Sequence, residues 1–266
     1  MTADPPPADP RPADPRPAVA EVPPDVPIRV GALAFPGMDQ IDLTGPFAVL
    51  CRLPNASVRL LAKETGPVAD QSGLRLVPDA TLADAGPIDL LVVPGGPGQE
   101  ELMEDEAVLA FLRRHAATAA CVYSVCTGAL LLGAAGLLKG RTATTHWASV
   151  PLLRYFGATA VDRRVAVDGR FVSAAGLTAG VDGALTVAAL LRGEAAAKAI
   201  QLALQYAPEP PFDCGSPASA PPGLLAEATD RFAPITARRL ATAKRAAARL
   251  GVSVEDESPS PRAEAG

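Results

Sequence analysis

A cysteine stands where an apolar, strand-like run gives way to a helix of small residues. The stretch is VYSVCTGALLLG (122–133), in which Cys126 precedes a threonine and a glycine. A nucleophile at such a strand-to-helix turn is lifted above the edge of the sheet, and the partial positive charge of the helix N-terminus favours its thiolate. We therefore predict that Cys126 is an exposed nucleophile with a pKa below its ordinary value of about 8.5, rather than a buried core thiol. Cys51 and Cys121 lie within helix and strand patterns and are predicted to be structural.

Two further side chains are candidates for acid–base chemistry. Asp42, in DQIDLTGP, follows an apolar strand and precedes a helix. Its carboxyl either acts as general acid and base toward the thiol, with burial tuning its pKa, or caps the helix. His146, in ATTHWA, either lines the pocket beside the thiol or belongs to a turn. The pattern leaves both alternatives open for each residue.

The glycines of VVPGG are predicted to bring backbone donors to the same place. Gly95 and Gly96 carry no Cβ, so the chain at these positions can approach a neighbour closely. The N–H groups at the start of a helix are unpaired within it, which leaves the Thr127 N–H available as well. We therefore expect these donors to stabilise an anion beside Cys126.

The elements that must position these residues follow from the hydrophobic pattern. Strands are expected at 28–35, 57–62, 89–96 and 121–125. Residues 163–176 are expected to form a hairpin that turns at Asp168-Gly169, or two short strands. Helices are expected at about 44–53, 105–119, 127–138, 147–156, 179–192 and 194–206. Continuously apolar strands that alternate with helices predict a doubly wound α/β fold, with a mostly parallel sheet covered on both faces. Ligands bind such sheets beyond the carboxyl ends of the strands.

The domain organisation is predicted from changes in composition. Residues 1–26 are proline-rich and are expected to form a disordered tail. The α/β domain is expected over 27–207, and a C-terminal extension over 208–266 contains one or two helices at about 222–250 and a disordered end. The basic residues of these helices are expected to form a solvated face rather than a DNA contact; they are Arg238, Arg239, Lys244, Arg245 and Arg249.

Composition and charge argue against several classes of protein. The 266 residues carry a net charge of −5, which argues against a nucleic-acid-binding surface over the whole chain. Four cysteines without a C-x-x-C pair, and two histidines, argue against a structural zinc site. No secretory signal is visible, so a cytoplasmic location is expected. The uncharged run 116–138 is long enough to span a bilayer, but its period changes midway, which favours a strand followed by a buried helix.

Several motifs in order resemble one known family. They are FPGMDQIDLTGP, VVPGG, SVCTGALLLGAAGLLKGRTATTHW and SAAGLTAGVDGAL, and the resemblance covers about residues 28–218. These motifs are similar to those of the ThiJ/PfpI branch of the class I glutamine amidotransferase-like superfamily, and within it to isonitrile hydratases. The resemblance implies a flavodoxin-like α/β sandwich that forms a homodimer and uses no metal or organic cofactor.

The resemblance also implies roles for individual residues. Cys126 is implied as the nucleophile, Asp42 as its acidic partner and Thr127 as an essential neighbour, with the backbone at Gly96 and the side chain of His146 in the pocket. The implied substrate is a small molecule, an isonitrile, which is hydrated to an N-substituted formamide through a cysteine thioimidate. The protease members of the family have histidine directly after the cysteine, and Thr127 in that place argues against protease activity.

Three other functions remain open on this sequence. The first is a glyoxalase that acts on small carbonyls through a hemithioacetal. The second is a ligand-sensing transcription regulator related to AraC-type proteins, but 59 residues follow Ala207, whereas a helix-turn-helix appendage of that kind needs on the order of 100. The third is a non-catalytic stress or binding protein with an oxidisable cysteine.

Overall fold

A seven-stranded sheet forms the centre of the computed structural model, which describes residues 18–254. The strand order is β10-β11-β7-β6-β1-β2-β5, and every neighbouring pair is parallel except β10 with β11. The strands are β1 (Ile28–Leu33), β2 (Ala56–Ala62), β5 (Ala80–Thr81), β6 (Leu90–Val93), β7 (Cys121–Val125), β10 (Val165–Asp168) and β11 (Phe171–Ala174). Two small sheets pair β3 (Val68–Ala69) with β4 (Arg75–Leu76) and β8 (Thr142–Ala143) with β9 (Thr159–Ala160).

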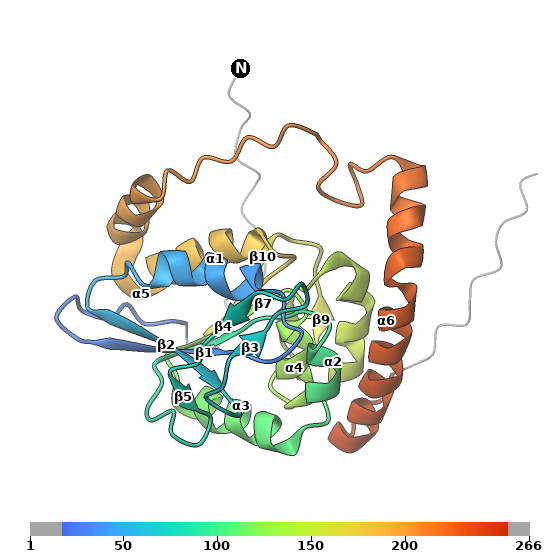
Figure 1. Cartoon of the computed structure of the whole chain (residues 1–266), viewed down its shortest axis with the longest axis horizontal. Helices are drawn as coiled ribbons and strands as arrows, with labels where there is room; N and C mark the ends of the chain where they lie inside the picture. The colour runs from blue at the N-terminus through green and yellow to red at the C-terminus, as the bar shows by residue number, and fades with distance from the viewer. Residues whose placement is uncertain (1–17, 255–266) are drawn as a thin grey trace, which may run out of the picture.

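Helices cover both faces of the sheet, as the sequence predicts (Figure 1). The helices are α1 (Ile41–Leu50), α2 (Gln99–Leu102), α3 (Glu106–Thr118), α4 (Gly128–Ala134), the 3-10 helix η1 (Trp147–Phe156), α5 (Ala179–Ala203) and α6 (Pro222–Leu250). Helices α1 and α5 pack together on one face, and α3 and α4 lie on the other (Figure 1). The doubly wound α/β fold is therefore confirmed.

The two inner strands β6 and β7 are buried along their whole length because helices lie on both sides of them. Every residue of β6 and of β7 is buried, which explains why these strands are continuously apolar or small rather than alternating. From β1 the chain moves to β2 on one side, and from β6 it moves to β7 on the other. This change of direction between β1 and β6 opens the crevice in which α/β proteins bind ligands.

The local elements agree with the pattern in most places. The hairpin of β10 and β11 is antiparallel, with Asp168 and Phe171 as the last pair before the turn. Helix α5 is bent at Gly193, whose φ of 79° is not helical, and the two predicted helices meet at this residue. No helix within residues 18–254 is long and apolar enough to cross a membrane. The uncharged run instead forms β7 and the buried helix α4, as predicted.

The ordered chain begins earlier than the sequence indicates. Arg192 of α5 is only 6% exposed, and its guanidinium donates hydrogen bonds to the carbonyls of Val22, Pro23 and Val26 at 2.5–2.6 Å. The Val22 N–H also donates to the Leu191 carbonyl. Residues 18–26 therefore pack on the domain, and the expectation that the tail orders nothing up to residue 26 is wrong for this part. Residues 1–17 lie outside the described part.

Removing residues 18–26 is expected to destabilise the domain. A chain that begins at residue 27 leaves the buried guanidinium of Arg192 without three acceptors, and a buried charged donor that loses its partners costs about 2 kcal/mol or more. Urea unfolding of this chain should therefore show a lower midpoint than unfolding of a chain that begins at residue 18. Equal midpoints would mean that the contacts of Arg192 contribute nothing.

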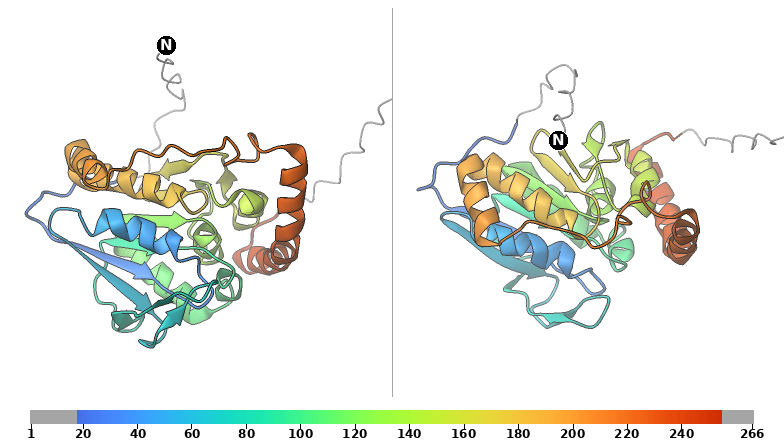
Figure 2. Two further views of the ribbon diagram at one scale, coloured as in Figure 1. Left: turned by 45° about the horizontal axis from the view of Figure 1, so that its top comes forward. Right: turned by 90° about the horizontal axis from the view of Figure 1, so that it is seen from above.

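The C-terminal extension belongs to the same folded body. Residues 208–221 cross from α5 to α6 (Figures 1 and 2), and α6 packs against η1, α4 and α2. Thr242, Ala243 and Ala246 of α6 are completely buried. The predicted region 222–250 forms one continuous helix, and residues 255–266 lie outside the described part. The extension therefore completes the core and does not form a separate unit.

Candidate functional site

Cys126 occupies the sharp turn between β7 and α4. Its φ of 54° lies in the left-handed region. Residues other than glycine rarely adopt this backbone conformation, and it persists only where the surrounding structure enforces it. The Cys126 N–H donates to the Ala174 carbonyl at 3.0 Å, and its own carbonyl accepts a hydrogen bond from the Thr145 hydroxyl at 2.7 Å. The strained strand-to-helix turn expected for a nucleophile is present.

The thiol of Cys126 is buried rather than exposed. Cys126 is only 6% exposed. Burial, and after it the negative charge of Asp42, raises the pKa of Cys126 well above its ordinary value. The Thr127 N–H and the guanidinium of Arg239 act in the opposite direction. The prediction of an exposed thiol with a lowered pKa is therefore wrong, because the loss of water around the buried sulfur raises the pKa by more than the helix N-terminus lowers it. The exposed cysteine is Cys51.

Asp42 is the buried acid of the site. It lies in the first turn of α1 and is 0% exposed, and its Oδ2 accepts a hydrogen bond from the Gly95 N–H at 3.1 Å. Burial, followed by repulsion from Asp39, raises the pKa of Asp42 to about 7, while the Gly95 N–H, the Cys126 thiol and the Leu177 N–H act to lower it. Its side chain makes no capping bond to α1. The structure therefore favours the role of general acid and base toward the thiol over the role of helix cap.

Gly95 and Gly96 lie within contact distance of the nucleophile turn. A Cβ on Gly95 would come within 2.5 Å of the Thr127 nitrogen, so only glycine fits there. The Gly95 N–H is taken by Asp42, and the Gly96 N–H donates to the Thr127 hydroxyl oxygen at 3.1 Å. These two donors hold the acid and the threonine in place. The expectation that the Gly96 N–H stands free to stabilise an anion is not met.

His146 lies at the edge of the site and combines both roles considered for it. Its Nδ1 accepts a hydrogen bond from the Ala148 N–H at 3.4 Å at the start of η1, and its ring packs 5.0 Å from that of Phe232. It also lines a cavity of about 380 Å³ together with Thr145 and Leu177. Burial, assisted by Arg239, lowers the pKa of His146 to about 4, so the ring is neutral at pH 7.

Arg239 of α6 is a site residue that sequence reasoning missed. It is 5% exposed, and its Nη2 donates to the Gly96 carbonyl at 3.0 Å and approaches the Thr127 hydroxyl oxygen at 3.5 Å. Its Nε donates to Gln99 Oε1 at 3.1 Å. The expected solvated face is therefore wrong for this arginine. The sequence offers only a partial signal, because small residues at helical spacing mark the buried face of α6 without separating Arg239 from Arg238: Thr242, Ala243, Ala246 and Ala247.

Leu177 is the second residue that the pattern did not reveal. Its φ of 36° is positive, in the loop between β11 and α5, and its backbone N–H is one of the groups that lower the pKa of Asp42. A non-glycine residue held in this conformation marks a place where the surroundings impose the backbone. The loop therefore contributes both to the environment of Asp42 and to the cavity wall.

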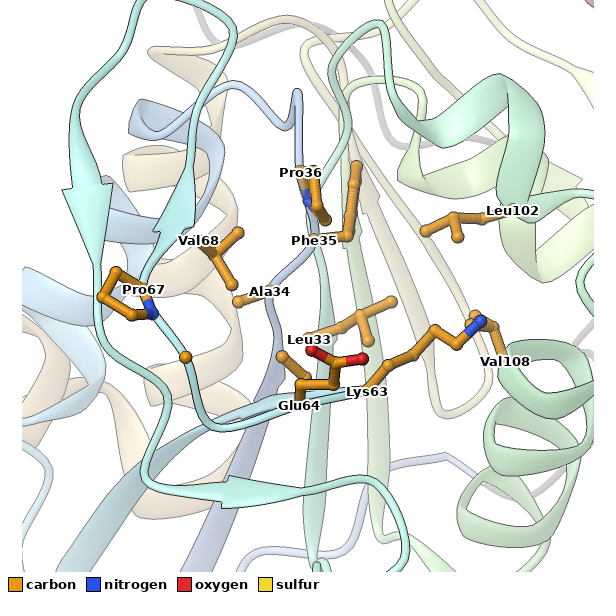
Figure 3. A pocket seen from close by; sticks show the side chains of 12 residues that line it. Leu33, Ala34, Phe35, Pro36, Lys63, Glu64, Pro67, Val68, Leu102 and Val108 are labelled. Atoms are coloured by element: carbon orange, nitrogen blue, oxygen red, sulfur yellow. The ribbon is translucent and has the colours of Figure 1, made fainter.

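A second cavity lies away from this site. Its volume is about 320 Å³, and its wall is mainly apolar with Lys63 and Glu64 among the side chains that line it (Figure 3). It is formed by the ends of β1 and β2 together with Leu102 and Val108. None of the residues around Cys126 lines it. The cavity beside His146 is connected to the nucleophile turn through Thr145, which lines it and whose hydroxyl donates to the Cys126 carbonyl.

Comparison with known proteins gives a consistent result. The model of the DJ-1/PfpI family matches residues 28–190. An isonitrile hydratase of Pseudomonas putida is 49% identical over 225 residues, which cover 85% of this chain and 99% of that protein. A glutathione-independent glyoxalase of Caenorhabditis elegans is 28% identical over 131 residues, 48% of this chain and 70% of that protein.

A solved structure agrees with these relatives. A ThiJ/PfpI family protein from Pseudomonas syringae superposes with a TM-score of 0.81 and 36% identity, over 88% of this chain and 97% of that one. The resemblance drawn from the motifs is therefore confirmed, and its range extends into the C-terminal helix. The chain belongs to the DJ-1/PfpI family.

Proposed function

We propose that the protein is an isonitrile hydratase, a lyase that adds water to an isonitrile to give an N-substituted formamide. The observation that carries the proposal is the buried pair of Cys126 and Asp42, in which the pKa of the acid is raised to about 7. Interacting groups of this kind titrate as a pair: the sulfur holds the shared proton at rest, and the carboxyl, whose pKa lies near neutrality, can take it over when the sulfur attacks. The 49% identity to the Pseudomonas putida isonitrile hydratase supports the same reaction.

The first step uses both members of the pair on one carbon. The terminal carbon of R–N≡C accepts a proton and a nucleophile, so the sulfur of Cys126 forms a C–S bond while the shared proton is transferred to that carbon. Asp42 Oδ2 is already occupied by the Gly95 N–H, and Oδ1 has no hydrogen-bond partner among the described residues. Oδ1 is therefore the oxygen that carries the proton. The product is the thioimidate R–N=CH–S–Cys, and Asp42 is left as the carboxylate.

The second step returns the pair to its starting state. Asp42 removes a proton from water as the oxygen adds to the thioimidate carbon, and it passes that proton to the nitrogen. The C–S bond then breaks, the hydroxyl proton returns to Asp42, and R–NH–CHO leaves. One proton is again shared between Asp42 and Cys126. Thr127, whose hydroxyl is fixed by the Gly96 N–H, orients the water.

The proposal is tested by product analysis with the purified protein. Incubation with a simple alkyl isonitrile should give the formamide at a rate that depends on protein concentration. In H₂¹⁸O the formamide should gain one ¹⁸O, and in D₂O the formyl carbon should carry deuterium, because the proton on that carbon comes from the exchangeable pair. Absence of formamide from a range of alkyl and aryl isonitriles would reject the assignment.

A glyoxalase is the second candidate, and the similarity to the Caenorhabditis elegans glyoxalase favours it. The same thiol would then add to the carbonyl of a small dicarbonyl compound to form a hemithioacetal. Removal of methylglyoxal that depends on Cys126, without formamide production from isonitriles, would support this function instead.

The resemblance also carries two expectations about the state of the protein. We include a homodimer in the proposal because the resemblance implies one. We include a cytoplasmic location because all four cysteines are free thiols and a nucleophilic thiol needs reducing conditions. Light scattering coupled to size-exclusion chromatography measures the mass of the particle, and a monomeric mass would contradict the dimer.

A further inference from the structure

Helix α6 brings a buried cation beside the nucleophile turn. Within the described part of the chain, the guanidinium of Arg239 donates only to neutral oxygens, those of Gly96, Gln99 and Thr127. Among residues 18–254, no carboxylate lies within ion-pair distance of it. The nearby acid Glu100 accepts a hydrogen bond from the Thr242 hydroxyl. Arg239 is therefore a cation that the fold buries without an ion-pair partner.

A buried charge of this kind is unfavourable unless an opposite charge compensates it. The group that can supply a negative charge is Cys126, because Thr127, which Arg239 approaches at 3.5 Å, directly follows it in the chain. The charge of Arg239 lowers the pKa of Cys126, and the charge of Cys126 raises the pKa of Arg239. The two groups therefore favour each other's ionised form.

We propose that Arg239 is a positioning residue that provides the countercharge for the ionised sulfur of Cys126 and holds Gly96 and Thr127 around it. The inference rests on the proposed nucleophilic role of Cys126. In the resting state the thiol is neutral and the cation is unpaired; when the sulfur ionises, and again when the C–S bond breaks, the negative charge forms beside a cation that is already in place. Catalysis of this type depends on charges that need no rearrangement during the reaction.

Other charged groups face the pair and must be taken into account. Asp42 of α1 acts on Cys126 with the opposite sign, and Glu100 of α2 and Arg238 of α6 act on Arg239. His146 is neutral at pH 7 because its pKa is about 4. Within this set, Arg239 is the one cation that favours the ionised thiol.

Three substitutions separate the charge of Arg239 from its contribution to packing. Arg239→Met removes the charge and keeps most of the volume. Gln99→Glu leaves Arg239 and its contacts in place but pairs the guanidinium with a carboxylate, which neutralises its effect. Arg249→Met is the matched control, because Arg249 also docks α6 onto the body, through the carbonyls of Met103 and Ala134.

The measurement is the rate of Cys126 alkylation by iodoacetamide as a function of pH, with peptide mapping to separate Cys126 from the exposed Cys51. An opposite charge within a few ångströms shifts a pKa by about 1–3 units. Arg239→Met and Gln99→Glu are therefore both expected to move the midpoint of alkylation upward by about one pH unit or more. Arg249→Met should leave it unchanged, and Arg239→Lys should keep most of the wild-type midpoint.

The outcomes decide between charge and packing. Wild-type midpoints in both Arg239→Met and Gln99→Glu would overturn the inference. A shift in Arg239→Met and Arg249→Met but not in Gln99→Glu would overturn it as well, because the docking of α6 would then be the cause. Alkylation requires no isonitrile, so the expected shifts in a protein that makes no formamide would reject the proposed function and leave the role of Arg239 intact.

Discussion

Cys126→Ala is expected to abolish formamide production, with a loss of about 10⁴-fold or more, because a reaction that proceeds through a covalent intermediate loses its nucleophile. The substitution removes one sulfur atom from a buried position, so the fold should persist. Formamide formation followed by chromatography, with circular dichroism to confirm folding, measures the effect.

The matched controls are the other cysteines. Cys51 is exposed, and Cys121 is buried in β7, where burial raises its pKa to about 12. Cys51→Ser and Cys121→Ala should both retain wild-type turnover, although Cys121→Ala is expected to lower the free energy of unfolding. If Cys126→Ala still produces formamide at the wild-type rate, the thioimidate pathway is wrong.

Asp42→Asn is expected to lower kcat by about 10²–10⁴-fold, the range that general acid–base catalysis typically contributes. Asparagine keeps the size of the side chain, and its oxygen can still accept the hydrogen bond of the Gly95 N–H, but it cannot carry the shared proton. Turnover measured between pH 5 and 9 should lose the limb that depends on Asp42, whose pKa is about 7. Wild-type kcat in Asp42→Asn would rule out a role for this acid in proton transfer.

The same substitution should change how stability depends on pH. The Asp42 carboxyl releases its proton at its ordinary pKa of 3.8 in the unfolded chain and at about 7 in the folded one. Between these values the folded protein binds the extra proton, so the free energy of unfolding falls as the pH rises from about 4 to about 7. Asp42→Asn removes this dependence. Thermal melts should therefore show a smaller loss of stability from pH 4 to pH 7 in the variant than in the wild type.

The sequence predicts the fold and part of the site because their signals are local. The apolar strands β6 and β7 can only be buried on both faces, and glycine marks the bend in α5 at Gly193. Cys126 and Asp42 follow strands that turn out to be neighbours of β6. Any parallel sheet brings the ends of neighbouring strands to one edge, so their meeting required no knowledge of side-chain packing.

The remaining features depend on contacts between distant segments. Nothing near Arg192 in the sequence indicates that it binds the carbonyls of Val22, Pro23 and Val26. Arg238 and Arg239 are adjacent, and only the packing of α6 decides which of them is buried. The pKa of the Cys126 thiol also depends on distant contacts. The sequence indicates the helix that begins after Cys126, but it does not indicate how completely the fold removes water from the sulfur.

The position of Arg239 near the end of the chain has a consequence for biosynthesis. A ribosome makes the chain from its N-terminus at about 5–20 residues per second, and domains begin to fold in that order. All strands of the central sheet precede α5, whereas Arg239 follows it by a crossing segment and half a helix. A nascent chain that stops before α6 is thus expected to have the strands of the sheet and the cysteine turn but to lack the cation that favours the ionised sulfur. Synthesis of α6 would then be the step that supplies the countercharge and closes the core over the thiol.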